Sequence, residues 1–475
     1  MKLNFDNQFA ALGEKFYAAI PARPLPNPRM VATNPNGAAL LDLDPDDLQS
    51  DDALQFFSGA RMIDGADPLA MVYAGHQFGG YSPRLGDGRG LLLGQVRNQK
   101  NELWDIHLKG AGPSPFCRGA DGRAVLRSSI REYLASEALH HLGIPTSRAL
   151  CLIHSDEPVQ RERLETAAGV IRLSETHVRF GSFEYFSYTN QHDELQALCD
   201  YTRRVHYPEV ADVDHMLQEI AGRTAEMIAA WQAFGFAHGV MNTDNMSILG
   251  QTFDYGPYGF MEAFDPHYIC NHSDDGGRYA FDQQPNVGLW NCLALAHALK
   301  PLLADETSIE QMREHYQIRF FRRYNRLMAD KLGLQTIAEG DEVLVHDLFD
   351  LMAENRVDYT LFFRQLSDRT DQPLPVLKDN APQFATWFAA YDARLAQDSQ
   401  TPEARRSAMR AINPKYILRN YLAQTAIEKA EQGDYSEIAR LHSLLQFPFD
   451  DQIEWDHYAS EPPDWGRHLD ISCSS

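Results

Sequence analysis

Hydrophobic periodicity changes once along this chain. Residues 61–190 contain short segments in which apolar and polar residues alternate, and this period of two is typical of β-strands. From about residue 210 to residue 400 the apolar residues recur every three or four positions, as in His215–Gly235 and Ile309–Leu332, which predicts helices. A β-rich first half followed by a helical second half predicts an α+β protein.

The length of the chain indicates more than one structural unit. Its 475 residues exceed the ~100–200 residues of a typical domain. Hydrophobic residues make up 44% and charged residues 23%, which is ordinary for a globular protein. We predict an N-terminal arm over residues 1–60, a β-rich unit over 61–190, a helical unit over 191–400 and a C-terminal helical extension over 401–475.

Charge and composition exclude several classes of protein. A net charge of −23 repels phosphate backbones, so we expect no nucleic-acid partner. No apolar segment reaches the ~18 residues of a membrane helix, and Met1–Ala10 does not resemble a secretion or transit signal. The six cysteines are scattered without a Cys-x-x-Cys pair, which argues against zinc and a secreted disulfide scaffold. We therefore expect a cytoplasmic protein without a membrane partner, and a monomer because no segment indicates an obligate interface.

A glycine-rich segment precedes two predicted strands. Gly86-Asp-Gly-Arg-Gly90 is followed by the apolar segment Leu91–Val96, a polar turn and then Leu103–Lys109. Apolar and polar residues alternate in the second strand, so one face should meet a core and the other, which carries Lys109, a cleft. Glycines let a backbone approach phosphates, and a strand-borne lysine can neutralise them. A simple hairpin turn with a solvent lysine is the alternative.

A helix is predicted over residues 122–141, with Asp121 as its N-cap. It carries Glu132 and Glu137, and a helical glutamate that reaches the strand lysine would hold that lysine in place. Helical-wheel geometry puts Glu137 nearer the apolar stripe of this helix but does not decide between the two. A helical glutamate more often lies in solvent.

Two arginines lie within apolar segments. Arg172 is in Gly169-Val-Ile-Arg-Leu, and Arg179 is in His177-Val-Arg-Phe-Gly. An arginine among apolar residues usually pairs with a carboxylate or an anion. A purely structural ion pair and an anion-binding role are therefore both open.

The helical half contains a polar loop, His238-Gly-Val-Met-Asn-Thr-Asp-Asn245. Protein kinases have seven positions between the His and the metal-binding Asn of their catalytic loop, and the same spacing occurs here. Nine residues later, Asp254-Tyr-Gly256 resembles the Asp-Phe-Gly metal motif. An Asn and an Asp on adjacent loops supply the oxygen ligands that Mg²⁺ takes beside a nucleotide. The pattern predicts a kinase-like nucleotide site.

The loop departs from kinases at one position. Val240 occupies the place of the kinase catalytic Asp. Asp244 is the acid within the loop and the best candidate to accept a proton from a hydroxyl nucleophile. Singly, Asp244-Asn245 could be an Asx turn and Asp254 a turn residue.

These segments resemble the selenoprotein O (YdiU) family of kinase-like protein adenylyltransferases. With the C-terminal Cys473-Ser-Ser, the resemblance spans essentially the whole chain. The matching motifs are Tyr73-Ala-Gly-His-Gln-Phe-Gly, Leu85-Gly-Asp-Gly-Arg-Gly, His107-Leu-Lys-Gly, Asp121-Gly-Arg-Ala-Val-Leu-Arg-Ser-Ser-Ile-Arg-Glu-Tyr-Leu, the 238–245 loop and Phe253-Asp-Tyr-Gly-Pro.

The resemblance implies a fold and an activity. The fold would be two-lobed, with a kinase-like N-lobe over 61–190, a helical C-lobe over 191–400 and extensions at both ends. ATP would bind in a flipped orientation, and AMP would pass to Ser, Thr or Tyr hydroxyls of protein substrates, self-modification included, with release of pyrophosphate. Mg²⁺ would be the cofactor, and UMP transfer from UTP with Mn²⁺ stays open.

The resemblance also assigns roles to residues. Asp244 would be the proton acceptor, Asn245 and Asp254 the metal ligands, and Glu132 the partner of the nucleotide-binding lysine. The nucleotide-binding set would be Gly86, Gly88, Arg89, Lys109, Asp121, Gly122, Arg172, Arg179 and Asp254.

Some members of the family carry selenocysteine three residues from the C-terminus, where this chain has Cys473. The redox centre that the resemblance implies would pair Cys473 with Cys270. Such a disulfide would tether the C-terminal tail to the segment that follows Asp254.

Two other functions are compatible with the same motifs. A protein kinase would use an unusual base and transfer the γ-phosphate. A pseudokinase scaffold would bind the nucleotide without turnover, but it has no need of Asp244.

Overall fold

The computed structural model describes residues 1–469 and 471. Its main sheet is antiparallel throughout, with the strand order β1-β3-β6-β7-β10-β9-β2, and β8 pairs with β10 off this path. These strands are β1 (Tyr17–Ala19), β2 (Arg29–Thr33), β3 (Leu69–Met71), β6 (Gly90–Arg97), β7 (Leu103–Lys109), β8 (Ala124–Val125), β9 (Arg148–Gln160) and β10 (Leu164–Ser174).

The predicted pair of strands is confirmed. β6 and β7 form an antiparallel pair, and the turn between them is closed by Asn98, whose side-chain oxygen accepts from the backbone N–H groups of Lys100 and Glu102. The apolar face of β7 meets a core, because Ile106 and Leu108 pack in one hydrophobic cluster with residues of α2 (Asp51–Phe57).

The prediction that the whole polar face of β7 meets a cleft is wrong for part of the strand. Asp105 is buried, and its carboxylate accepts from Gln95 at 2.7 Å and from the backbone N–H of His177 at 2.7 Å. His107 and Lys109 do line a cavity. Periodicity identifies a polar face, but it cannot show which distant segment covers that face.

The predicted helix over residues 122–141 begins later than expected. Residues Ala124 and Val125 form β8, and α3 (Leu126–His141) follows directly. Asp121 is therefore not its N-cap, and its carboxylate accepts from the backbone N–H of Arg123 instead. Gly122 has a φ of 68°, which a right-handed helix does not allow, so the helix cannot begin at this residue.

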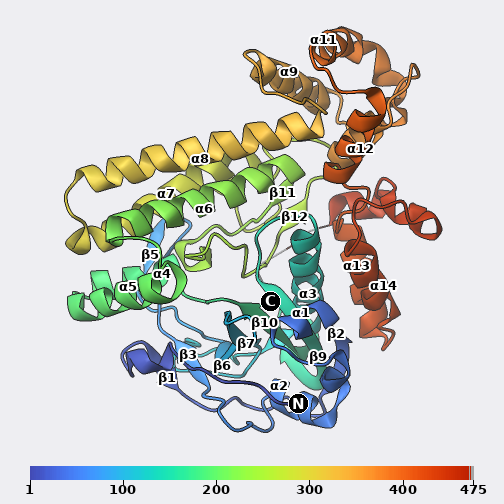
Figure 1. The fold of residues 1–475 in the computed structure, drawn as a ribbon. Coiled ribbons are helices and arrows are strands. Elements are labelled where there is room, and N and C mark those ends of the chain that lie inside the picture. Colours follow the sequence, from blue (N-terminus) through green and yellow to red (C-terminus); the bar gives the residue numbers. More distant parts are fainter. Residues whose placement is uncertain (470, 472–475) are drawn as a thin grey trace.

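The helical half matches the predicted periodicity. The two predicted helices are α6 (Val213–Phe234), which ends at the left-handed Gly235, and α8 (Thr307–Lys331). They pack along each other with α7 (Gln284–Leu299) against α6, as Figure 1 shows. The other helices up to this point are α1 (Pro35–Leu40), α4 (Phe180–Tyr188) and α5 (His192–His206).

The C-terminal helices extend away from α8 and return to α3. α13 and α14 both pack on α3, and in Figure 1 they flank it on the side away from α6. This region comprises α9 (Asp341–Glu354), α10 (Tyr359–Ser367), α11 (Ala385–Leu395), α12 (Pro402–Ile412), α13 (Asn420–Glu431) and α14 (Ser436–Leu445). The short strands outside the main sheet are β4 (Gly75–Gln77), β5 (Gly80–Ser82), β11 (Phe236–Ala237) and β12 (Gly259–Phe260).

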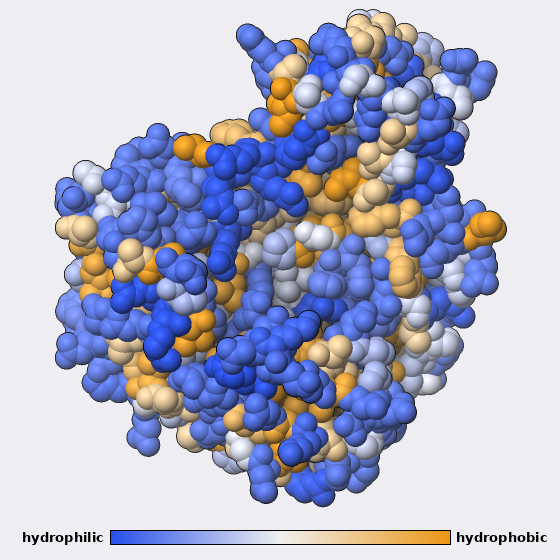
Figure 2. Space-filling model, in the orientation of Figure 1, coloured by the Kyte–Doolittle hydropathy of each residue, from blue (hydrophilic) through white to orange (hydrophobic). Residues whose placement is uncertain are grey.

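The fold is mixed α and β, in agreement with the predicted α+β class. Within the described part of the chain, no helix combines the length and the apolarity that a bilayer crossing requires. The face in Figure 2 is mostly hydrophilic, with apolar residues in small groups.

Candidate active site

A cavity of about 710 Å³ is lined by residues from both halves of the chain. It brings together most of the predicted site residues: Lys109 comes from β7, Arg172 comes from β10, and the others come from five segments outside the strands and α-helices. The predicted residues in its wall are Gly86, Gly88, Arg89, Lys109, Asp121, Gly122, Arg172, Arg179, Asp244, Asn245 and Asp254.

The glycines of the 86–90 loop are required by close packing. A Cβ atom on Gly86, where φ is 77°, would lie 2.5 Å from the ring of Phe116. A Cβ atom on Gly88 would lie 3.0 Å from the backbone oxygen of the same residue. Between them, Asp87 is buried and accepts from the backbone N–H of Met71 at 3.0 Å. The loop is thus held closely between two neighbouring segments at the edge of the cavity.

Glu132 is the carboxylate that contacts the strand lysine. Its two oxygens bond to Lys109 Nζ and to Arg172 Nε, and all three side chains are buried. Burial alone would raise the pKa of Glu132, but Arg172 and Lys109 outweigh it and hold that pKa at about 2. Glu137 lies elsewhere and forms a buried pair with Arg148, at 2.8 and 2.7 Å.

Asp254 joins the two arginines that the sequence placed among apolar residues. Its Oδ1 lies 2.7 Å from Arg172 Nη1, and its Oδ2 lies 2.6 Å from Arg179 Nη1. Arg179 also donates to the backbone oxygen of Asp244 at 2.8 Å and stacks on Tyr73, 4.3 Å from the ring centroid. Burial opposes ionisation of Asp254, but Arg172 and Arg179 hold its pKa well below the usual range. Arg172 and Arg179 therefore form structural ion pairs with Asp254 and also line the cavity, where they could contact an anion.

The cluster has an excess of positive charge. Its four cations are Arg89, which is half-buried, and Lys109, Arg172 and Arg179, which are buried. They face three ionised carboxylates, Glu132, Asp254 and Asp87, which leaves a net charge of +1. Burial lowers the pKa of Lys109 to about 8, while Glu132 acts in the opposite direction, so the lysine stays protonated at pH 7. An anionic ligand in the cavity would offset this excess.

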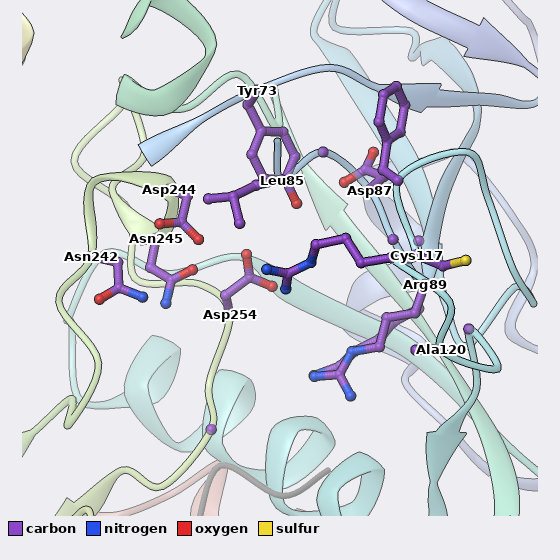
Figure 3. Close-up of a pocket in the computed structure, with 18 of the residues that line it drawn as sticks. Tyr73, Leu85, Asp87, Arg89, Cys117, Ala120, Asn242, Asp244, Asn245 and Asp254 are labelled. Carbon is purple, nitrogen blue, oxygen red and sulfur yellow. The ribbon is translucent and has the colours of Figure 1, made fainter. Parts of the chain in front are cut away.

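The 238–245 loop forms the other wall. His238 is buried, donates from Nε2 to the backbone oxygen of Phe253 at 3.1 Å, and stacks on Trp231. Val240 lines the cavity, so the place of a kinase catalytic Asp is apolar. Figure 3 shows Asp244, Asn245 and Asp254 on the same side of the cavity, with Arg89 across from them. Burial raises the pKa of Asp244 to about 7.

Asn245 and Asp254 fit a divalent cation that is completed by a nucleotide. The side-chain amide of Asn245 donates to the backbone oxygen of Val240 at 3.0 Å, which leaves its side-chain oxygen available as a ligand. Both residues offer hard oxygen atoms, as Mg²⁺ requires. The described residues contain no cluster of three or more His, Cys, Asp or Glu side chains able to hold a metal. Two protein ligands suit a metal whose other ligands are phosphate oxygens and water.

Sequence reasoning missed several residues of the cavity wall. Arg161 forms a two-pronged ion pair with Asp121, at 2.7 and 3.0 Å. Tyr73, Gln77 and Phe78 also line the cavity. The last three belong to the 73–79 motif, so the motif itself was the available signal, whereas Arg161 lies in a polar turn with no distinguishing pattern.

The predicted cysteine pair cannot be placed as a pair. Cys270 is buried near Ala237, whose backbone oxygen lies 3.5 Å from its sulfur. Cys473 lies outside the described residues. The Cys270–Cys473 disulfide stays a prediction, which peptide mapping of the oxidised protein would test.

Together, the paired lysine and glutamate, the Asn and Asp loops and the surplus of cations define a nucleotide-type phosphate site. Comparison with known proteins specifies the family. The family model described as "Protein adenylyltransferase SelO" matches residues 1–446. A protein nucleotidyltransferase YdiU of Pseudomonas fluorescens (strain Pf0-1) is 53% identical, and one of Pseudomonas aeruginosa (strain UCBPP-PA14) is 52% identical. In both comparisons all of this chain aligns with 99% of the relative.

This chain therefore belongs to the SelO family, and it is an enzyme of the nucleotidyltransferase class. A nucleotidyltransferase uses a nucleoside triphosphate as substrate, together with a divalent metal in most cases, and the cavity contains groups suited to both.

Proposed function

We propose that this protein transfers AMP from ATP to the hydroxyl group of a Ser, Thr or Tyr residue in a protein, with release of pyrophosphate. The acceptor would be another protein or a second site on the same chain. The observation that carries the proposal is the cluster of four cations against three carboxylates in the cavity wall beside Asp244. A site with this surplus can hold a polyanionic leaving group while the acceptor hydroxyl is deprotonated next to it.

ATP would lie with its terminal phosphates among the buried cations and its α-phosphate towards Asp244. In this orientation the reacting phosphorus is not the one that a kinase presents to its catalytic Asp. Val240 occupies the place of the kinase catalytic Asp. In the proposed orientation no acid is needed there, because the phosphorus that reacts lies beside Asp244 instead. The surplus of positive charge supports this orientation, since pyrophosphate carries more negative charge than a single transferred phosphoryl group.

The transfer step would proceed as follows. The acceptor oxygen forms a bond to the α-phosphorus, and the bond from that phosphorus to the α,β-bridging oxygen breaks. The electron pair of the broken bond leaves with pyrophosphate, whose charge Lys109, Arg172 and Arg179 offset. The hydroxyl proton passes to Asp244. Asn245 and Asp254 would hold Mg²⁺, which supplies further neutralisation of the phosphates when bound.

The architecture that we propose is that of a two-lobed, kinase-like enzyme. Residues 61–190 would form the N-lobe, residues 191–400 the C-lobe, and residues 1–60 and 401–475 the extensions. The cavity wall supports this division, because the strand lysine and the glycine loop come from the first range and the metal loops from the second.

The test uses ATP labelled at either the α- or the γ-phosphate, a protein acceptor and Mg²⁺, with Asp254→Ala as the control. We expect label in protein from α-labelled ATP only, and none with Asp254→Ala. Label from γ-labelled ATP only would make the protein a kinase with an unusual base. ATP binding without either label would make it a scaffold.

The choice of nucleotide is a separate question for the same assay. The groups described would contact phosphates and metal, so they do not by themselves distinguish ATP from UTP. A parallel reaction with α-labelled UTP and Mn²⁺ would show UMP transfer by the same site.

A further inference from the structure

A small hairpin lies directly on the loop that carries Asp244. It consists of β4 and β5, joined by a turn at Phe78 and Gly79. The backbone N–H of His76 donates to Thr243 Oγ1 at 2.7 Å, and the backbone N–H of Phe78 donates to Asn242 Oδ1 at 3.3 Å. Residues 76–78 of the hairpin are therefore hydrogen-bonded to residues 242–244 of the loop, although about 165 positions separate the two segments in the sequence.

Gly75 allows this close approach. A Cβ atom at Gly75 would lie 2.6 Å from Asp244 Oδ1 and 2.9 Å from Asp244 Cβ. Contacts below about 3.0 Å are not tolerated by real Cβ atoms, so any side chain at residue 75 would displace either the hairpin or the carboxylate. The carboxylate of Asp244 is thus packed against the hairpin backbone.

The two oxygens of Asp244 have different surroundings. Oδ1 is fully buried against Gly75, and within the described part of the chain it has no hydrogen-bond partner. Oδ2 accepts from the side-chain amide of Gln77 at 3.1 Å. Because Asp244 and Gln77 both line the cavity while Oδ1 is buried, Oδ2 is the oxygen that a molecule in the cavity can reach.

The amide of Gln77 is itself oriented. Ser82, on the opposite strand of the hairpin, donates from its hydroxyl to Gln77 Oε1 at 3.4 Å. This contact directs the nitrogen of the amide towards Asp244. The nearby Arg179 donates to the backbone oxygen of Asp244 and not to its carboxylate, so Gln77 is the side chain seen to orient that carboxylate.

We propose that Gln77 is a positioning residue, which holds Asp244 Oδ2 towards the cavity so that this oxygen can accept the proton of the acceptor hydroxyl. This inference rests on the proposed function. The torsion that turns an Asp carboxylate is broad, so packing at Oδ1 alone does not fix the plane of the carboxylate. A carboxylate oxygen has two lone pairs, and Gln77 uses one, which leaves the second for the hydroxyl.

Glutamine suits this task better than a charged residue would. A neutral amide orients the carboxylate without adding a cation that would compete with the acceptor for it. Gln77 does not contact the buried Lys109–Glu132–Arg172 group, so its loss should leave nucleotide binding intact. The predicted defect is therefore in the rate of transfer.

The experiment compares Gln77→Leu, which keeps the size and removes the amide, with Tyr81→Phe in the same hairpin. We expect Gln77→Leu to lower kcat for transfer from α-labelled ATP by about 10- to 100-fold, a range typical of misplaced catalytic groups. The Kd for Mg-ATP should stay within about twofold, as should both values for Tyr81→Phe. A kcat of Gln77→Leu equal to that of the wild type would overturn the proposal.

A double variant separates positioning from a general structural effect. If Gln77 acts through Asp244, Gln77→Leu should cause no further loss in an Asp244→Asn background. An equal loss in both backgrounds would mean that Gln77 supports the hairpin or the cavity wall by another route, and the proposal would fall.

A crystal structure of Gln77→Leu gives a readout that does not depend on transfer. We expect the hairpin in place and the Asp244 carboxylate rotated, whereas an unrotated carboxylate would overturn the proposal. If the wild-type protein transfers no label from α-labelled ATP, the proposed function fails, and this structure alone decides whether Gln77 orients Asp244.

Discussion

At the scale of single residues, Glu132 holds two cations in place. Replacing it by Gln leaves Lys109 and Arg172 buried without this carboxylate, and breaking a buried pair costs about 3–5 kcal/mol. We expect Glu132→Gln to lower the free energy of unfolding by about that amount in urea denaturation. We also expect weaker binding of Mg-ATP by titration calorimetry, because Lys109 loses the contact that fixes its position.

Glu137 provides the matched control for this prediction. It lies on the same helix, is equally buried and pairs with Arg148 outside the cavity wall. Glu137→Gln should destabilise the protein to a similar extent while leaving the affinity for Mg-ATP unchanged. A parallel loss of affinity in both variants would show that the effect of Glu132 comes from stability alone.

Sequence patterns predicted the residues of this cluster better than their partners. Lys109 was expected on the polar side of a strand, and Arg172 and Arg179 were expected to pair with a carboxylate or an anion. The wheel could not choose between Glu132 and Glu137, because α3 is buried on nearly every side and has no clear solvent face. The pairing of Asp254 with both arginines depends on the tertiary fold, which local periodicity does not contain.

At the scale of elements, the entry into α3 depends on Gly122. Its φ is 68°, and a Cβ atom would lie 2.1 Å from the carbonyl carbon of Gly112. We expect Gly122→Ala to push the cavity wall at residue 122 away from the backbone of Gly112, so that both the free energy of unfolding and the affinity for Mg-ATP fall. Urea denaturation and calorimetry measure the two quantities.

Gly119→Ala is the control that separates the energetic cost of a left-handed backbone from the cost of the steric clash with Gly112. Gly119 has a φ of 83°, but nothing lies within 4 Å of its added Cβ atom. Its substitution should cost only the ~1–2 kcal/mol of an unfavourable left-handed backbone. Equal destabilisation by the two variants would mean that the contact with Gly112 relaxes without cost.

The elements themselves were predictable where one pattern ran uninterrupted. The strand Leu103–Lys109 and the helices α6 and α8 have a regular period and clear ends. The start of α3 was placed too early because Asp121 and Gly122 look like a helix start in sequence. In the structure the next residues pair with β10, and this long-range contact overrides the local signal.

At the scale of the whole molecule, the C-terminal helices support the helix that carries Glu132. α13 and α14 pack on α3. Arg131, next to Glu132, donates to the backbone oxygen of Tyr258 at 2.6 Å and contacts Asn420 Oδ1 at 3.3 Å. The sequence indicated a separate C-terminal extension, but nothing in its periodicity showed that its helices pack on α3.

Arg419, the residue before α13, is a buried cation that connects the C-terminal helices to earlier parts of the chain. It donates to both oxygens of Asp358, at 2.8 and 3.2 Å, and to Glu262 in the segment after Asp254. Arg419→Met would leave these carboxylates without their cation, at a cost of about 3–5 kcal/mol. We expect faster hydrogen exchange in α13 and α14 by mass spectrometry, together with a lower melting temperature.

The surface pair of Arg467 supplies the comparison for Arg419. Arg467 is 41% exposed and pairs with Glu461 at 2.9 Å, and exposed pairs contribute only about 0–1 kcal/mol. Arg467→Met should therefore change neither exchange in α13 nor the melting temperature appreciably. If Arg419→Met leaves exchange in α13 and α14 at the wild-type rate, packing on α3 alone holds these helices, and the ion cluster is dispensable. If exchange also rises in α3, then α13 and α14 stabilise the helix that carries Glu132, and through it they stabilise the position of Lys109 in the candidate nucleotide site.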